Sequence, residues 1–100
     1  MVEQNALTQI LDDYLNCAAI QDFCPNGLQV AGKQEISKIV TGVTACQALI
    51  DAAIDIKADA ILVHHGYFWK NENLTITGIK RTRLKQLLQY DINLYAYHLP

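Results

Sequence analysis

Hydrophobic residues near the amino terminus recur with helical spacing, three and four positions apart, between Gln4 and Leu15. They are Leu7, Ile10, Leu11, Tyr14 and Leu15. This spacing predicts an amphipathic helix. The next segment, 22–27, contains Pro25 and the pair Asn26-Gly27, which interrupt regular structure, so we expect a turn there.

Two apolar runs farther along have the character of strands. Residues 36–43 are rich in β-branched side chains, and residues 60–64 begin with four apolar ones, as in a strand buried on both faces. Between them Thr44 is followed three residues later by Gln47. This capping-box pattern predicts a helix over 45–57, and the helix would carry on one face Ala45, Leu49, Ala52, Ala53 and Ile56.

The same alternation then continues to the end of the chain. Leucines at helical spacing predict a helix over 81–90, and 92–97 follows as a third strand. A strand–helix–strand–helix–strand order favours an α/β fold with a parallel-sheet core and flanking helices. The sequence stops at Pro100, directly after the third strand, with no helix to cover the sheet. We therefore expect residues 1–100 to be an incomplete amino-terminal lobe.

The composition narrows the class of protein. Of the 100 residues, 51% are hydrophobic and 18% charged, which is typical of a globular domain and excludes a disordered chain or coiled coil. The net charge of −2 gives no general attraction to nucleic acid or membranes. No signal peptide or membrane-length apolar run is seen, and three cysteines without C-x-x-C spacing favour reduced thiols, so we expect a cytoplasmic protein. Cys46 lies at a predicted helix start, where its thiol could be activated, or it is simply a small buried residue.

All three histidines lie at the carboxyl ends of predicted strands. His64 and His65 close the second strand, and His98 closes the third. Ligands of parallel α/β sheets bind at this edge, and imidazole is the commonest ligand of zinc, iron and manganese. Because neighbouring residues on a strand point to opposite faces, the pair hints at two metal ions rather than one. Hydrogen-bonded core histidines remain the alternative.

The segment from Gly66 to Gly78 has no pattern of helix or strand. Gly66 allows a sharp turn after the histidines, and Tyr67-Phe68-Trp69 follows as either a base-stacking platform or lid, or an aromatic cluster buried in the domain or against another subunit. Residues 80–85 then hold half of the basic side chains. They could bind substrate phosphate, or they could be the solvated face of the third helix.

Four segments together are similar to one known family. They are 22–30, 39–44, 63–70 with its His-His-Gly, and 93–100 with its His-Leu-Pro. They resemble, in register over almost the whole chain, the Nif-three-like family, whose members carry the name GTP cyclohydrolase 1 type 2 homologue, and within it the bacterial YbgI type.

The resemblance implies a two-lobe α/β fold that assembles as a toroidal hexamer around a dinuclear metal centre. His64 and His65 match the first two metal ligands, and His98 matches a residue beside the site, where it would shuttle protons or orient the ligands. The family's other ligands are an aspartate two residues after the matching proline, and a histidine and a glutamate near its carboxyl terminus. The sequence ends before all three, so we expect residues 1–100 alone to bind metal weakly or not at all.

Two functions follow from these observations. The first is a metal-dependent hydrolase of a nucleotide-like or similar small substrate, in which His64 and His65 hold iron, manganese or zinc and an activated water attacks. The second is a ring-shaped scaffold or regulatory protein that binds metal and a partner without catalysis. For both we expect self-association and no membrane, and nucleic acid is only weakly indicated as a partner.

Overall fold

The structure is a computed structural model that describes residues 1–19, 22, 24–70, 72 and 74–99. Phe23 and Pro100, which belong to the motifs above, lie outside the described residues. The described elements are β1 Val2–Glu3, α1 Gln4–Tyr14, a 3-10 turn Cys17–Ala19, β2 Gly27–Val30, β3 Glu35–Ile36, β4 Ile39–Thr41, α2 Gln47–Asp55, β5 Ala60–Val63, α3 Gly78–Gln89 and β6 Asn93–Ala96.

The main sheet has four strands in the order β2-β6-β5-β4. Strands β4, β5 and β6 are parallel neighbours, which confirms the predicted parallel core. The turn predicted over 22–27 leads into an unpredicted edge strand, β2, which pairs antiparallel with β6. A separate two-stranded pair joins β1 to β3.

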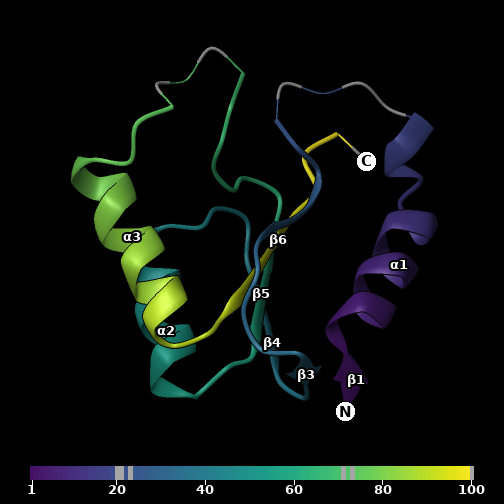
Figure 1. The fold of residues 1–100 in the computed structure, drawn as a ribbon, viewed down its shortest axis with the longest axis horizontal. Coiled ribbons are helices and arrows are strands. Elements are labelled where there is room, and N and C mark those ends of the chain that lie inside the picture. The colour runs from purple at the N-terminus through teal and green to yellow at the C-terminus, as the bar shows by residue number, and fades with distance from the viewer. Residues whose placement is uncertain (20–21, 23, 71, 73, 100) are drawn as a thin grey trace.

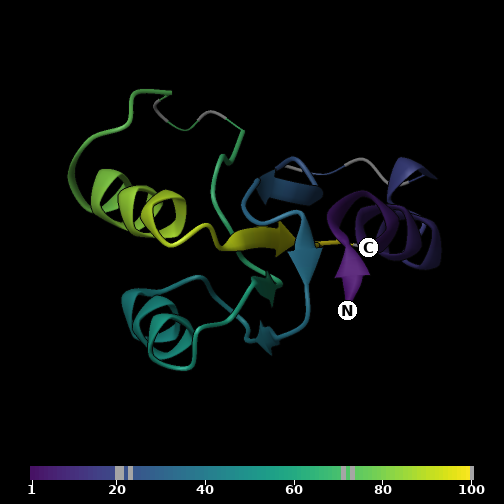
Figure 2. The same cartoon turned by 60° about the horizontal axis from the view of Figure 1, so that its bottom comes forward.

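Helices cover both faces of the sheet (Figures 1 and 2). Helices α2 and α3 lie on one face, where Ile50 of α2 and Leu87 of α3 are fully buried against β5 and β6. Helix α1 covers the other face, where Leu7 and Leu11 pack against a second buried cluster that includes Tyr95. The predicted helix is therefore confirmed, although Ile10 and Tyr14, also at its apolar positions, are exposed.

The run predicted as one strand over 36–43 is divided between β3 and β4. The carboxylate of Asp59 accepts hydrogen bonds from the amides of Ser37 and Lys38, at 2.9 and 3.1 Å. These amides are thereby drawn away from strand pairing. The β-branched pattern could not reveal this interruption, because it depends on a side chain about twenty residues away.

The predicted capping box is wrong. Helix α2 begins after Cys46, whose side chain makes no capping hydrogen bond. Thr44 instead forms an isolated parallel bridge with His65. The Gln47 amide donates to Asp51 and to Gln86 of α3, so it ties the two helices together.

The buried side-chain amide of Asn93, in β6, links segments from both ends of the chain. Asn93 is fully buried, and its side chain donates to the carbonyls of Lys33 and Asp59 and accepts from Gln4 and from the Gly32 amide. All of its hydrogen-bonding capacity is used, as burial of an amide requires. No described helix is long and apolar enough to cross a membrane.

Candidate metal centre

Two neighbouring histidines lie close together directly after β5. The amides of His64 and His65 both donate to the carbonyl of Val43, at 3.0 and 2.7 Å. The register of β4 and β5 continues through the parallel bridge between Thr44 and His65, so the chain stays in step with its neighbour up to the histidines. Their two rings lie 4.3 Å apart between centroids.

His98 joins this pair from the neighbouring strand. It follows β6 by two residues, and its ring centroid lies 4.8 Å from that of His64 and 5.3 Å from that of His65. The candidate ligand nitrogens of the three residues all lie within 4.8 Å of one another. The sequence-based expectation that the imidazoles converge at one sheet edge is confirmed.

Each imidazole uses its Nδ1 atom within the protein. His64 Nδ1 lies 3.3 Å from the carbonyl oxygen of Tyr97, His65 Nδ1 lies 3.4 Å from the hydroxyl of Thr44, and His98 Nδ1 lies 2.8 Å from Asp22. Among the described residues no hydrogen bond is made to any of the three Nε2 atoms. A partner on one ring nitrogen is what orients a metal-binding imidazole and leaves the other nitrogen to coordinate.

The contact of His98 with Asp22 belongs to a larger clasp. Asp22 also accepts from the Leu99 amide at 2.7 Å and from the Asn26 side chain at 3.0 Å, while Asn26 accepts from the His98 amide at 2.8 Å. The Asp22 side chain is 2% exposed. The clasp joins the turn before β2 to the segment after β6.

Two ionisable groups near the clasp are held neutral. Burial, and then the nearby Asp22 charge, raise the pKa of the Cys24 thiol. Burial raises the pKa of Tyr97 far above its usual value, and its hydroxyl donates to Asp12 at 2.7 Å, which raises it further. Both groups stay protonated at neutral pH, so neither adds negative charge to the site.

The aromatic run closes one side of the histidine cluster. The Trp69 ring stands edge-on to His98, at 4.8 Å between centroids, and 5.8 Å from His65. Tyr67 is buried and donates to the Ala45 carbonyl, whereas Phe68 and Trp69 are half-buried. The prediction of a buried run is thus confirmed for Tyr67 and only partly for its neighbours. The described residues of 66–77 form no helix or strand.

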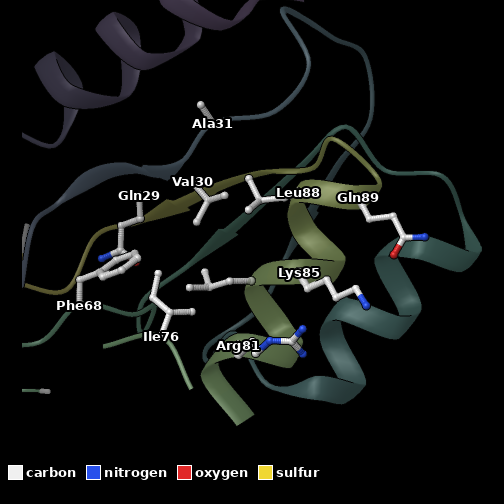
Figure 3. Close-up of a pocket in the computed structure, with 10 residues that line it drawn as sticks. Gln29, Val30, Ala31, Phe68, Ile76, Arg81, Lys85, Leu88 and Gln89 are labelled. Carbon is white, nitrogen blue, oxygen red and sulfur yellow. The ribbon is translucent and has the colours of Figure 1, made fainter. Parts of the chain in front are cut away.

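A separate groove lies between β2 and α3 (Figure 3). Its volume is about 960 Å³, and Arg81 and Lys85 of the basic segment border an otherwise largely apolar lining. Lys80 does not line the groove. Its ammonium lies 4.5 Å above the Phe68 ring and 3.5 Å from the carboxylate of Glu72. The basic side chains are therefore not all a solvated helix face, but none of the three histidines lines this groove.

The chain as a whole matches a known family. The profile of the Duf34/NIF3 (NGG1p interacting factor 3) family matches residues 2–100. The chain belongs to this family.

Curated relatives agree in name. Proteins called GTP cyclohydrolase 1 type 2 homolog are 63% identical in Yersinia pestis and 65% in Pasteurella multocida, each over 94% of this chain. The Escherichia coli K12 protein of that name is 59% identical over 99% of this chain. The chain spans about 40% of the length of such relatives.

Solved structures agree in fold. The structure described as protein ybgI, of unknown function, superposes with a TM-score of 0.97 at 58% identity, and a Thermus thermophilus protein with 0.93 at 40%. Each match covers 99% of this chain and about 40% of the other. Reduced HcgD from Methanocaldococcus jannaschii shares the fold alone, with a TM-score of 0.84 at 23% identity.

Sequence reasoning missed the partners of the histidines. Asp22 and Asn26 belong to the family-like segment 22–30 and to the predicted turn, but the sequence patterns assign neither a role. The capping-box pattern assigns Thr44 to a helix cap. The polar character of Asp22 and Asn26 is the available signal, but only the fold shows that this turn meets the segment after β6.

Proposed function

We propose that His64, His65 and His98 form one side of a divalent-metal centre in a hydrolase of a nucleotide-like or related small substrate. The observation that carries the proposal is the convergence of three imidazoles whose Nδ1 atoms are all engaged, which leaves three Nε2 atoms to coordinate. The name of the relatives, which refers to a GTP-directed enzyme, supports a nucleotide-like substrate.

The donor set suits the metals expected from the sequence. Neutral imidazoles bind zinc, iron and manganese, and three protein ligands with open positions are typical of catalytic rather than structural zinc. The rings of His64 and His65 lie only 4.3 Å apart between centroids, so these two residues do not by themselves require a second ion. A dinuclear centre would need further donors, and carboxylates from a chain of the relatives' length are the expected source.

Each residue would have a distinct task. His64 and His65 would hold the ion, and His98 would either complete the set or take up a proton through Nε2. A divalent ion there would supply Lewis acidity and lower the pKa of a coordinated water. Trp69, edge-on to His98, would limit access of bulk water to one side of the cluster.

A panel of nucleotides, tested with the full-length protein loaded with iron, manganese or zinc, examines the proposal. We expect hydrolysis of at least one nucleotide, and we expect His65→Ala to abolish both turnover and metal retention. Asp55→Asn, on the exposed end of α2, is a matched control that should change neither.

A second function, a metal-dependent ring-shaped scaffold in the cytoplasm, is favoured by one feature. No general acid or base apart from His98 lies in the described part of the histidine cluster. A hexamer that retains metal but hydrolyses no member of the panel would support the scaffold and contradict the hydrolase.

A further inference from the structure

Asp22 uses its two carboxylate oxygens for different purposes. Oδ1 faces Nδ1 of His98 at 2.8 Å. Oδ2 accepts from the Leu99 amide at 2.7 Å and from the Asn26 amide group at 3.0 Å. The side chain is almost fully buried, so water competes little with these bonds.

The directions of these hydrogen bonds determine where the His98 proton lies. An ionised carboxylate only accepts hydrogen bonds, so Nδ1 of His98 must be the donor in its contact with Oδ1. In a neutral imidazole one nitrogen carries the proton and the other an exposed lone pair. In the neutral form of His98, Nε2 is therefore the nitrogen with the lone pair.

We propose that Asp22 is a positioning residue that holds His98 in the tautomer with its proton on Nδ1, and so keeps the Nε2 lone pair available at the cluster of His64 and His65. This inference rests on the proposed function for its purpose, but the tautomer itself can be observed without metal. A carboxylate behind an imidazole is a recurrent device for fixing the orientation of a metal-binding or proton-accepting histidine.

Direct ligation by Asp22 is the competing explanation. Ligand atoms of Asp22, Cys24 and His98 lie within 4.8 Å of one another and could surround an ion. Both Asp22 oxygens are already engaged, and the contact at 2.8 Å places a proton, not an ion, between Asp22 and His98. The geometry thus favours positioning, and ligation becomes one outcome of the test.

Asp22→Asn tests the inference with almost no change in shape. The amide oxygen of the variant must stay where Leu99 and Asn26 donate, because both are donors. Its NH₂ group then faces Nδ1 of His98, which has to accept. The His98 proton should therefore move from Nδ1 to Nε2.

Long-range ¹H–¹⁵N correlation spectra of histidine-labelled, metal-free protein at about pH 8, above the ordinary imidazole range, report the tautomer of each histidine. The His98 signals are identified by their absence in His98→Gln. We expect the Nδ1–H form in the unmodified protein and the Nε2–H form in Asp22→Asn. An Nε2–H form in the unmodified protein would overturn the inference even if the variant failed to fold.

Two controls separate positioning from a structural role. Asn26→Ala loosens the same clasp but leaves the contact of Asp22 with Nδ1, so it should lower the melting temperature and keep the tautomer. Asp22→Glu retains a carboxylate and should restore the Nδ1–H form. An Asp22→Asn variant that is merely less stable, with its tautomer unchanged, would refute positioning.

Metal affinity of the full-length protein, measured by competition with a chelator for Zn²⁺, gives the second readout. We expect Asp22→Asn to weaken binding about 10- to 100-fold, the usual cost of losing such a partner. Loss of metal without a change of tautomer would mean that Asp22 is itself a ligand and would overturn the inference. A shifted tautomer in a protein that binds no metal would sustain the role of Asp22 and contradict the proposed function.

Discussion

Gly66, directly after the histidine pair, is constrained by space. A Cβ atom added there would lie 2.7 Å from the Cβ of buried Ala96 and would overlap the side-chain oxygen of Gln29. That oxygen accepts the Tyr67 amide at 2.7 Å. The sharp turn anticipated from the sequence is not the reason for glycine, because Gly66 is not among the residues with positive φ.

Gly66→Ala should therefore be strongly destabilising. Ordinary contact begins near 3.4 Å, so Ala96 or the loop must move by about 0.7 Å, and overpacking of this kind costs about 1–3 kcal/mol. Displacing Gln29 leaves the Tyr67 amide without its hydrogen-bond acceptor, which lowers the stability by about 1–3 kcal/mol more. The sum is about 2–6 kcal/mol. Even its lower bound corresponds to a fall of at least about 8 °C in melting temperature for a chain of this size.

Urea unfolding of three variants measures the effect and its cause. Gly78→Ala is the control, because a Cβ there meets nothing within 4 Å and only its φ of +60° is unfavourable, at about 1–2 kcal/mol. Ala96→Gly in the Gly66→Ala background removes the closest rigid overlap and should recover part of the loss. Equal costs at Gly66 and Gly78, or no recovery with Ala96→Gly, would refute the steric argument.

Three further predictions concern a carboxylate, a buried amide and the metal. Burial would raise the pKa of Asp59, but the hydrogen bonds that its carboxylate accepts from two backbone amides, together with the Lys33 ammonium, hold this pKa below its usual value. Asp59→Asn should therefore cost about 1–3 kcal/mol at neutral pH. Asn93→Leu strands the partners of the amide and should cost about 3 kcal/mol or more, against almost nothing for the exposed Asn5→Leu in α1. Elemental analysis after dialysis should find metal in the full-length protein and little in residues 1–100.

Each of these three predictions can be contradicted by a specific result. A lowered folded-state pKa stabilises above the unfolded value, near 3.9, and that contribution is lost as pH falls through the folded value. The difference in free energy of unfolding between Asp59→Asn and the unmodified protein, measured by urea unfolding, should thus disappear below about pH 4. A difference that does not change with pH would contradict the lowered pKa of Asp59. An Asn93→Leu variant with an unchanged melting temperature would show that the hydrogen bonds of Asn93 are not needed for stability. Tightly held, stoichiometric metal in residues 1–100 would mean that further ligands lie within this chain.

The local patterns predicted what depends on neighbouring residues. Helices α1, α2 and α3 and the parallel strands β4, β5 and β6 follow from apolar periodicity, which is dictated by the core each segment faces. Histidines at strand ends were recognised for the same reason, since strand ends are visible in the sequence. What the patterns could not show are contacts between distant segments: the interruption by Asp59, the antiparallel β2, and the Val43 carbonyl that the amides of His64 and His65 share.

The candidate site is built from residues beside all four strands of the main sheet, although only two of these strands lead into histidines. The imidazoles follow the central strands β5 and β6, and Tyr97, also after β6, supplies the carbonyl behind His64. The partner of His65, Thr44, follows edge strand β4, and the partner of His98, Asp22, precedes the other edge strand, β2. Each histidine is therefore oriented by a residue that lies beside a different strand from the one that the histidine follows. Metal affinity should consequently depend on strand pairing across the whole sheet, so a variant that loosens an edge strand should weaken the site without removing a single ligand.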